Sequence, residues 1–149
     1  MKNSKRINTL VELSSEKETA ALKDLGVAQR KSIELQNQIE SLKKYRQEYQ
    51  DKLSHLGNGG LTIDQLIEFR SFIDKLDKAI VGQESVLSQC REQVLLKRRA
   101  WENLHKKTGS LQKILDSATV SEMKHEHKRE QAEQDERATR LGRNYQNGI

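Results

Sequence analysis

The chain has 149 residues, of which 33% are charged, 34% hydrophobic and 4% aromatic; it has no proline, and its net charge of +5 identifies no partner. Globular domains are close to half apolar, so this composition excludes a wide layered core and favours long exposed helices or disorder. The single cysteine excludes a disulfide framework and fits a reducing compartment. No apolar run reaches the ~20 residues of a membrane span, and the polar first residues do not resemble a signal peptide, so we expect a cytosolic protein.

A first helix is predicted over about residues 5–56. Positions spaced alternately three and four residues apart, from Ile7 to Leu56, are apolar in eleven of fifteen cases, against about a third for the whole chain. This spacing is the heptad pattern of helices that pack side by side. We call these positions, and their equivalents after residue 60, the heptad seam.

A tight turn is predicted over residues 57–61. Three glycines in the run Gly57-Asn58-Gly59-Gly60 favour the positive φ values that end a helix. Thr62 follows, with Gln65 three residues later, which is the pattern of a capping box at the start of a second helix.

The second helix is predicted over about residues 62–118, where thirteen of sixteen seam positions from Leu66 to Ala118 are apolar. Two helices joined by a tight turn run antiparallel and bury their seams on each other. The predicted fold is therefore all-α: a long two-helix antiparallel coiled-coil hairpin over residues 1–118. Residues 119–149 lack the seam and are expected to form a polar tail that is frayed helix or disordered.

Polar seam residues suggest how the two helices align. If polar groups meet polar groups, Glu18 lies opposite Lys97 and Ser32 opposite Gln83. The same alignment places small Ser14 opposite bulky Trp101.

The sequence offers little for catalysis, and we expect no catalytic residue, cofactor or metal. His125 and His127 would lie on different sides of a helix, so they would not share a metal ion there. Cys90 falls on the heptad seam, where a small buried side chain is more common than a nucleophile. The glycines of the turn lack the Lys-Ser/Thr ending of a phosphate-binding loop.

A basic block lies between residues 97 and 107. It is either a solvated face, an electrostatic contact with an acidic protein surface, or a nucleic-acid contact. No aromatic stripe accompanies it for stacking on bases, which argues against nucleic acid. The residues of this possible electrostatic contact are Lys97, Arg98, Arg99, Lys106 and Lys107.

Four of the six aromatic residues flank the turn, and the antiparallel pairing brings them together. Two of them, Tyr45 and Phe72, lie beside the seam rather than on it. With Ala79 and Val86 they form one side of the hairpin, which we call the apolar edge. The other side, the ionic edge, carries Lys43, Arg70, Asp77, Glu84 and Arg91. Because coiled coils usually carry charges on both sides, the apolar edge is a candidate docking site, although it could merely widen the seam.

At these residues the chain resembles the FliJ-type flagellar type III export proteins. The resemblance covers roughly residues 7–118 and is most specific from 38 to 80. The matching features are Leu10-x-x-Leu13, Leu25-Gly26, Tyr45-Arg46-Gln47-Glu48-Tyr49, Gly57-Asn58-Gly59 and Phe72-Ile73-x-x-Leu76-x-Lys78-Ala79-Ile80.

The resemblance implies a non-enzymatic, cytoplasmic component of flagellar protein export. It implies three partners: a hexameric export ATPase whose assembly the protein promotes as a central stalk, the cytoplasmic domain of the export gate, and chaperones of late export substrates. The protein would lie at the inner membrane of the flagellar base through these partners only. The positions implied for the gate contact are Gln38, Leu42, Tyr45, Tyr49, Phe72, Leu76 and Ala79.

One position departs from the family pattern, because Gln83 stands where a histidine is expected. Two alternatives to the flagellar function stay open. One is the stalk of a virulence type III secretion ATPase or of another rotary ATPase. The other, of a different class, is a basic helical module that binds nucleic acid.

Overall fold

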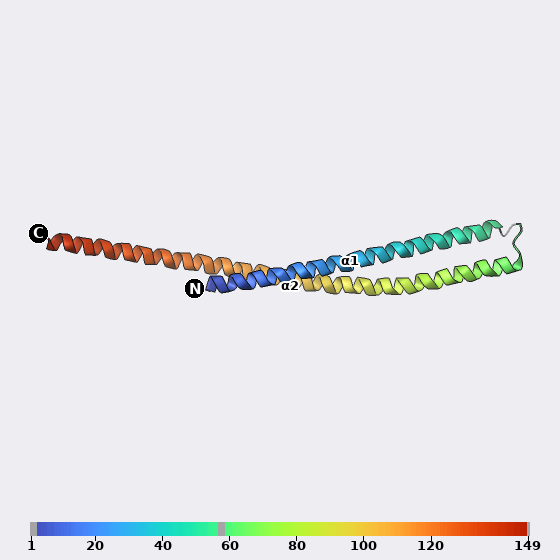
Figure 1. Ribbon diagram of the computed structural model, residues 1–149, viewed down its shortest axis with the longest axis horizontal. Helices are drawn as coiled ribbons and strands as arrows, with labels where there is room; N and C mark the ends of the chain where they lie inside the picture. Colours follow the sequence, from blue (N-terminus) through green and yellow to red (C-terminus); the bar gives the residue numbers. More distant parts are fainter. Residues whose placement is uncertain (1–2, 57–58, 149) are drawn as a thin grey trace. The chain divides into compact units, whose positions relative to one another are not determined.

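Two α-helices account for the regular structure of the described part of the chain. The computed structural model describes residues 3–56 and 59–148. Helix α1 spans Asn3–Leu56 and helix α2 spans Ile63–Asn147 (Figure 1). Their cross-helix contacts run in opposite directions along the sequence, because Lys43 contacts Glu84 whereas Arg46 contacts Asp77. The predicted all-α antiparallel hairpin is therefore confirmed.

The chain divides into two compact units. The turn-side unit comprises residues 19–103, with most of α1 and the first half of α2. The terminal unit combines the residues up to Glu18 with those from Leu104 onward. Within the described residues, neither helix contains a stretch long and apolar enough to cross a bilayer.

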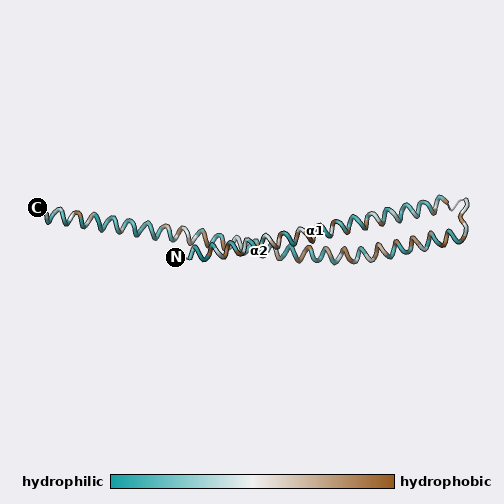
Figure 2. The backbone as a smooth tube through the Cα atoms, in the orientation of Figure 1, coloured by the Kyte–Doolittle hydropathy of each residue, from teal (hydrophilic) through white to brown (hydrophobic). Residues whose placement is uncertain are grey.

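The core of the turn-side unit is the heptad seam. The buried aliphatic side chains all occupy seam positions: Leu25, Ile39, Ile73, Leu76, Ile80 and Leu87. Ile39 is the most buried, at 3% exposure, and it forms one cluster with Ile80 and Leu87. Brown apolar positions recur along the helices in this part of the chain (Figure 2). Because two helices enclose only a narrow interface, the few apolar residues of this charge-rich chain are enough to fill it.

The helix start after the turn is built as the capping pattern predicts. Gln65 donates its backbone N–H to Thr62 Oγ1, and Thr62 donates its N–H to Gln65 Oε1, both at 3.3 Å. Gly60 has a φ of 133°, a conformation that residues with a Cβ avoid. Gly57 and Asn58, the first two residues of the predicted turn, lie outside the described residues.

The predicted alignment of the helices is wrong by about one heptad. Ser14 contacts Thr108 rather than Trp101, and Glu18 contacts His105 rather than Lys97. A shift of seven residues returns seam positions to seam positions, so the apolar pattern fits both alignments equally well. The actual alignment brings two hydroxyl groups together and places a carboxylate beside an imidazole.

Helix α2 continues well beyond residue 118, the end that the loss of the seam predicts. It reaches Asn147, and every described residue after Ser121 is exposed. Figure 2 colours this stretch mostly as hydrophilic. Local contacts support the helix here, because Glu136 pairs with Arg140 one turn later at 2.8 Å. The division into a hairpin over residues 1–118 and a separate tail stays a prediction.

Candidate partner-binding surface

The aromatic residues beside the turn form one cluster centred on Tyr49. The ring centroid of Tyr49 lies 4.6 Å from that of Phe72, 5.3 Å from that of Tyr45 and 5.9 Å from that of Phe69. Tyr49 and Phe69 are half-buried in the seam, whereas Tyr45 is 49% exposed and Phe72 is 38% exposed. The central ring therefore holds two outer rings in position while each of these keeps a large accessible surface.

The residues implied for the gate contact divide into two groups by burial. Gln38, Tyr45, Phe72 and Ala79 are exposed, so a partner can reach them directly. The other three belong to the heptad seam, and their first role is to hold the helices together. These are Leu42 and Tyr49, which are half-buried, and Leu76, which is 8% exposed.

The opposite edge is ionic. Lys43 Nζ lies 2.9 Å from Glu84 Oε1, and Arg46 contacts both carboxylate oxygens of Asp77. The hydrogen bond to Asp77, together with its charge, raises the pKa of Arg46 above its usual value. The two edges of the hairpin therefore differ in chemistry near the turn, as the heptad assignments predict.

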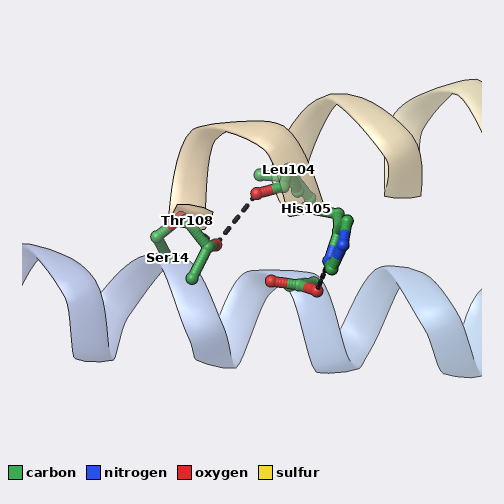
Figure 3. Close-up of polar contacts among 5 residues, drawn as sticks. Ser14, Leu104, His105 and Thr108 are labelled. Carbon is green, nitrogen blue, oxygen red and sulfur yellow. Dashed lines mark hydrogen bonds and ion pairs between the residues drawn. The ribbon is translucent and has the colours of Figure 1, made fainter. Parts of the chain in front are cut away.

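A polar layer crosses the seam in the terminal unit (Figure 3). Ser14, 4% exposed, lies 2.7 Å from the hydroxyl of Thr108, which donates a hydrogen bond to the Leu104 carbonyl. One turn away, His105 Nδ1 lies 2.6 Å from Glu18 Oε1. The hydrogen bond from His105 is the main reason that the pKa of Glu18 is lowered. These contacts satisfy polar groups that would otherwise be costly to bury.

A second polar contact holds the start of α1. Glu122 on α2 accepts hydrogen bonds from the backbone N–H of Ser4 at 3.1 Å and from the Ser4 hydroxyl at 2.6 Å. The first turn of α1 has no acidic residue of its own, so this carboxylate supplies the negative charge that a helix N-terminus favours. Residues 4 and 122 are far apart in the chain, so no local or periodic sequence pattern indicates this contact.

The basic block is distributed over both units. Lys97, Arg98 and Arg99 are exposed in the turn-side unit, and Lys106 and Lys107 are exposed in the terminal unit. Cys90 is half-buried on the seam, and His125 and His127 are exposed. Within residues 3–56 and 59–148, no three His, Cys, Asp or Glu side chains are grouped closely enough to hold a metal ion.

Comparison with known proteins identifies the family. The family model described as "Flagellar FliJ protein" matches residues 3–147, which is almost the whole chain. The chain belongs to the FliJ family. Two curated FliJ-family relatives support this assignment. The flagellar FliJ protein of Salmonella typhi is 26% identical over 134 residues, covering 90% of this chain and 91% of the relative. That of Escherichia coli K12 is 25% identical over 132 residues, covering 89% and 90% respectively. No solved structure matches the chain.

Proposed function

We propose that this FliJ-family chain is a non-enzymatic component of the flagellar type III export apparatus. In this proposal it acts as a central stalk that promotes assembly of the hexameric export ATPase. It also contacts the cytoplasmic domain of the export gate and escorts the chaperones of late substrates, on the cytoplasmic face of the inner membrane. The observation that carries the proposal is an exposed aromatic edge beside the turn in a chain that matches this family almost end to end.

In this proposal each of the two units binds a different partner. The turn-side unit offers Tyr45 and Phe72 to the gate, on an edge that carries no charged side chain among its four members. The terminal unit offers paired helices to the ATPase, and its polar layer fixes their alignment. In this proposal the partner ATPase hydrolyses ATP. The packed helices of this chain couple the ATPase mechanically to the gate.

The gate contact is tested with Tyr45→Ala and Phe72→Ala in the full chain. Both side chains are outside the buried seam, so we expect the helix content to be retained while binding to the purified cytoplasmic domain of the gate is lost. Val81→Ala is the matched control, because Val81 is 67% exposed on α2 but lies off the apolar edge. Equal losses from Val81→Ala and Phe72→Ala would show that the edge is no specific contact.

The ATPase contact is tested separately. We expect the purified chain to stimulate ATP hydrolysis by the flagellar export ATPase, and we expect Tyr45→Ala to leave this stimulation unchanged. A chain that binds the gate without stimulating the ATPase would remove the stalk function from the proposal.

A further inference from the structure

The positive charge of the chain is concentrated at one level of the hairpin. The offsets of the Lys43–Glu84 and Arg46–Asp77 pairs set residues 91–99 of α2 level with residues 24–36 of α1, so segment 22–33 of α1 and segment 91–99 of α2 largely share one level of the turn-side unit. These two segments, which we call the basic region, contain seven Lys and Arg residues and only two acidic residues, Asp24 and Glu92. Their net charge equals the +5 of the whole chain, so the remaining residues are neutral in sum.

The cations of the basic region form no ion pair with any residue that the structure describes. On α2, the ionic edge continues at heptad intervals from Asp77 and Glu84 to Arg91 and Arg98. The first two pair with Arg46 and Lys43 of α1. The offset of the Lys43–Glu84 pair places the two arginines level with the uncharged Gln36 and Gln29. Glu40 lines the same groove as Arg91 but forms no ion pair with it among the described residues. Among the described residues none of the seven cations forms an ion pair, and all seven are exposed: Lys23, Arg30, Lys31, Arg91, Lys97, Arg98 and Arg99.

Half-exposed aliphatic side chains lie among these cations. Leu95 is 50% exposed and sits on the same side of α2 as Arg91 and Arg98, four residues after one and three before the other. Leu22 of α1 is 50% exposed, three heptads from Lys43 and so on the ionic-edge side. The other exposed aliphatic residues of the region are Val27 at 52%, Ile33 at 57% and Leu96 at 54%.

We propose that the basic region binds an anionic lipid surface directly. Cations interspersed with aliphatic side chains suit the boundary between phospholipid headgroups and acyl chains, where the cations meet phosphates and the aliphatic groups leave water. A nucleic acid would use the charges but not the aliphatic groups, and the region has no aromatic side chain for stacking on bases. This contact goes beyond membrane association through partners, and it does not depend on the proposed export function.

The test is flotation of the full chain with vesicles of phosphatidylcholine alone or of phosphatidylcholine mixed with phosphatidylglycerol. We expect binding to the mixed vesicles only, and we expect it to weaken as salt is raised. The double variant Arg91→Gln/Arg98→Gln should lower the partition constant on the order of 30-fold, as expected for two basic residues at an anionic surface. Lys44→Gln/Lys113→Gln removes the same charge outside the region and should lower it much less.

A second pair of variants tests the aliphatic contribution. Leu22→Gln/Leu95→Gln should lower binding about tenfold at unchanged net charge, because these side chains would no longer leave water at the membrane. Ile67→Gln/Val81→Gln changes two exposed aliphatic residues outside the region and should leave binding unchanged. Circular dichroism of each variant checks that its helix content is retained.

Three results would overturn the proposal. The first is equal binding, or no binding, to the two kinds of vesicle. The second is an equal effect of the charge variants inside and outside the basic region. The third is displacement of the chain from mixed vesicles by polyglutamate or RNA while the Leu22→Gln/Leu95→Gln variant binds normally, which would identify a contact for acidic polymers.

Discussion

Replacing Ile39 by alanine should destabilise the turn-side unit more than any change at an exposed position. Ile39 is 3% exposed and packs in one cluster with Ile80 and Leu87, with Leu35 and Leu42 at its border. Removing its outer carbons loses their transfer free energy and leaves a cavity between the helices. For buried Ile→Ala changes the cost is about 2–5 kcal/mol. We expect a value near the lower end, about 2–3 kcal/mol, because a two-helix interface can partly close over the gap.

Ile33→Ala is the matched control, since it makes the same chemical change on the same helix at a residue that is 57% exposed. Its effect should stay within about 0.5 kcal/mol. Urea unfolding followed by circular dichroism measures both variants. Ile39→Ala should lower the midpoint with an unchanged slope, whereas Ile33→Ala should leave the midpoint close to that of the unmodified chain. Equal midpoints for the two variants would refute the conclusion that the heptad seam is the core.

Three further predictions follow from single residues. Gly82→Ala should stabilise the chain by about 0.5–1 kcal/mol in urea unfolding, because Gly82 lies inside α2 and a Cβ there meets no atom within 4 Å; a loss of stability would contradict this. Glu122→Ala should lower the free energy of unfolding by about 1 kcal/mol and speed amide hydrogen exchange in the first turn of α1, since Ser4 loses both hydrogen bonds. Faster exchange in α2 alone would contradict this. The pKa of Glu18 is lowered from its ordinary value of 4.5, so its contact with His105 stabilises the chain above that pH and is lost as the pH falls through the lower folded-state value. Thermal unfolding below pH 4.5 should therefore depend less on pH in Glu18→Gln, and identical profiles would exclude this linkage.

The heptad seam and the capping box could be predicted because both are local or periodic. The apolar spacing fixes which face of each helix is buried, and Ile39, Leu76 and Ile80 are buried where that spacing places them. The Thr62 and Gln65 pair is three residues apart, so its geometry follows from the helix itself.

The extent of α2 could not be predicted from the seam. The seam reports burial against a partner helix, whereas a helix can continue on backbone hydrogen bonds and contacts one turn apart such as Glu136–Arg140. The difference in exposure within the implied gate contact, by contrast, follows from the pattern. Leu76 lies on the heptad seam and is 8% exposed, whereas Tyr45 lies beside the seam and is 49% exposed.

The sequence by itself determined an antiparallel pair of amphipathic helices, the turn between them and the chemistry of each edge near that turn. Only the tertiary structure decided the alignment, because a seven-residue shift leaves every seam position on the seam. Cross-helix contacts between distant polar residues, such as Ser14 with Thr108 and Ser4 with Glu122, select one alignment from the equivalent ones. Within the turn-side unit, the Lys43–Glu84 and Arg46–Asp77 pairs set residues 22–33 close to residues 91–99 and so bring cations from both helices to one level.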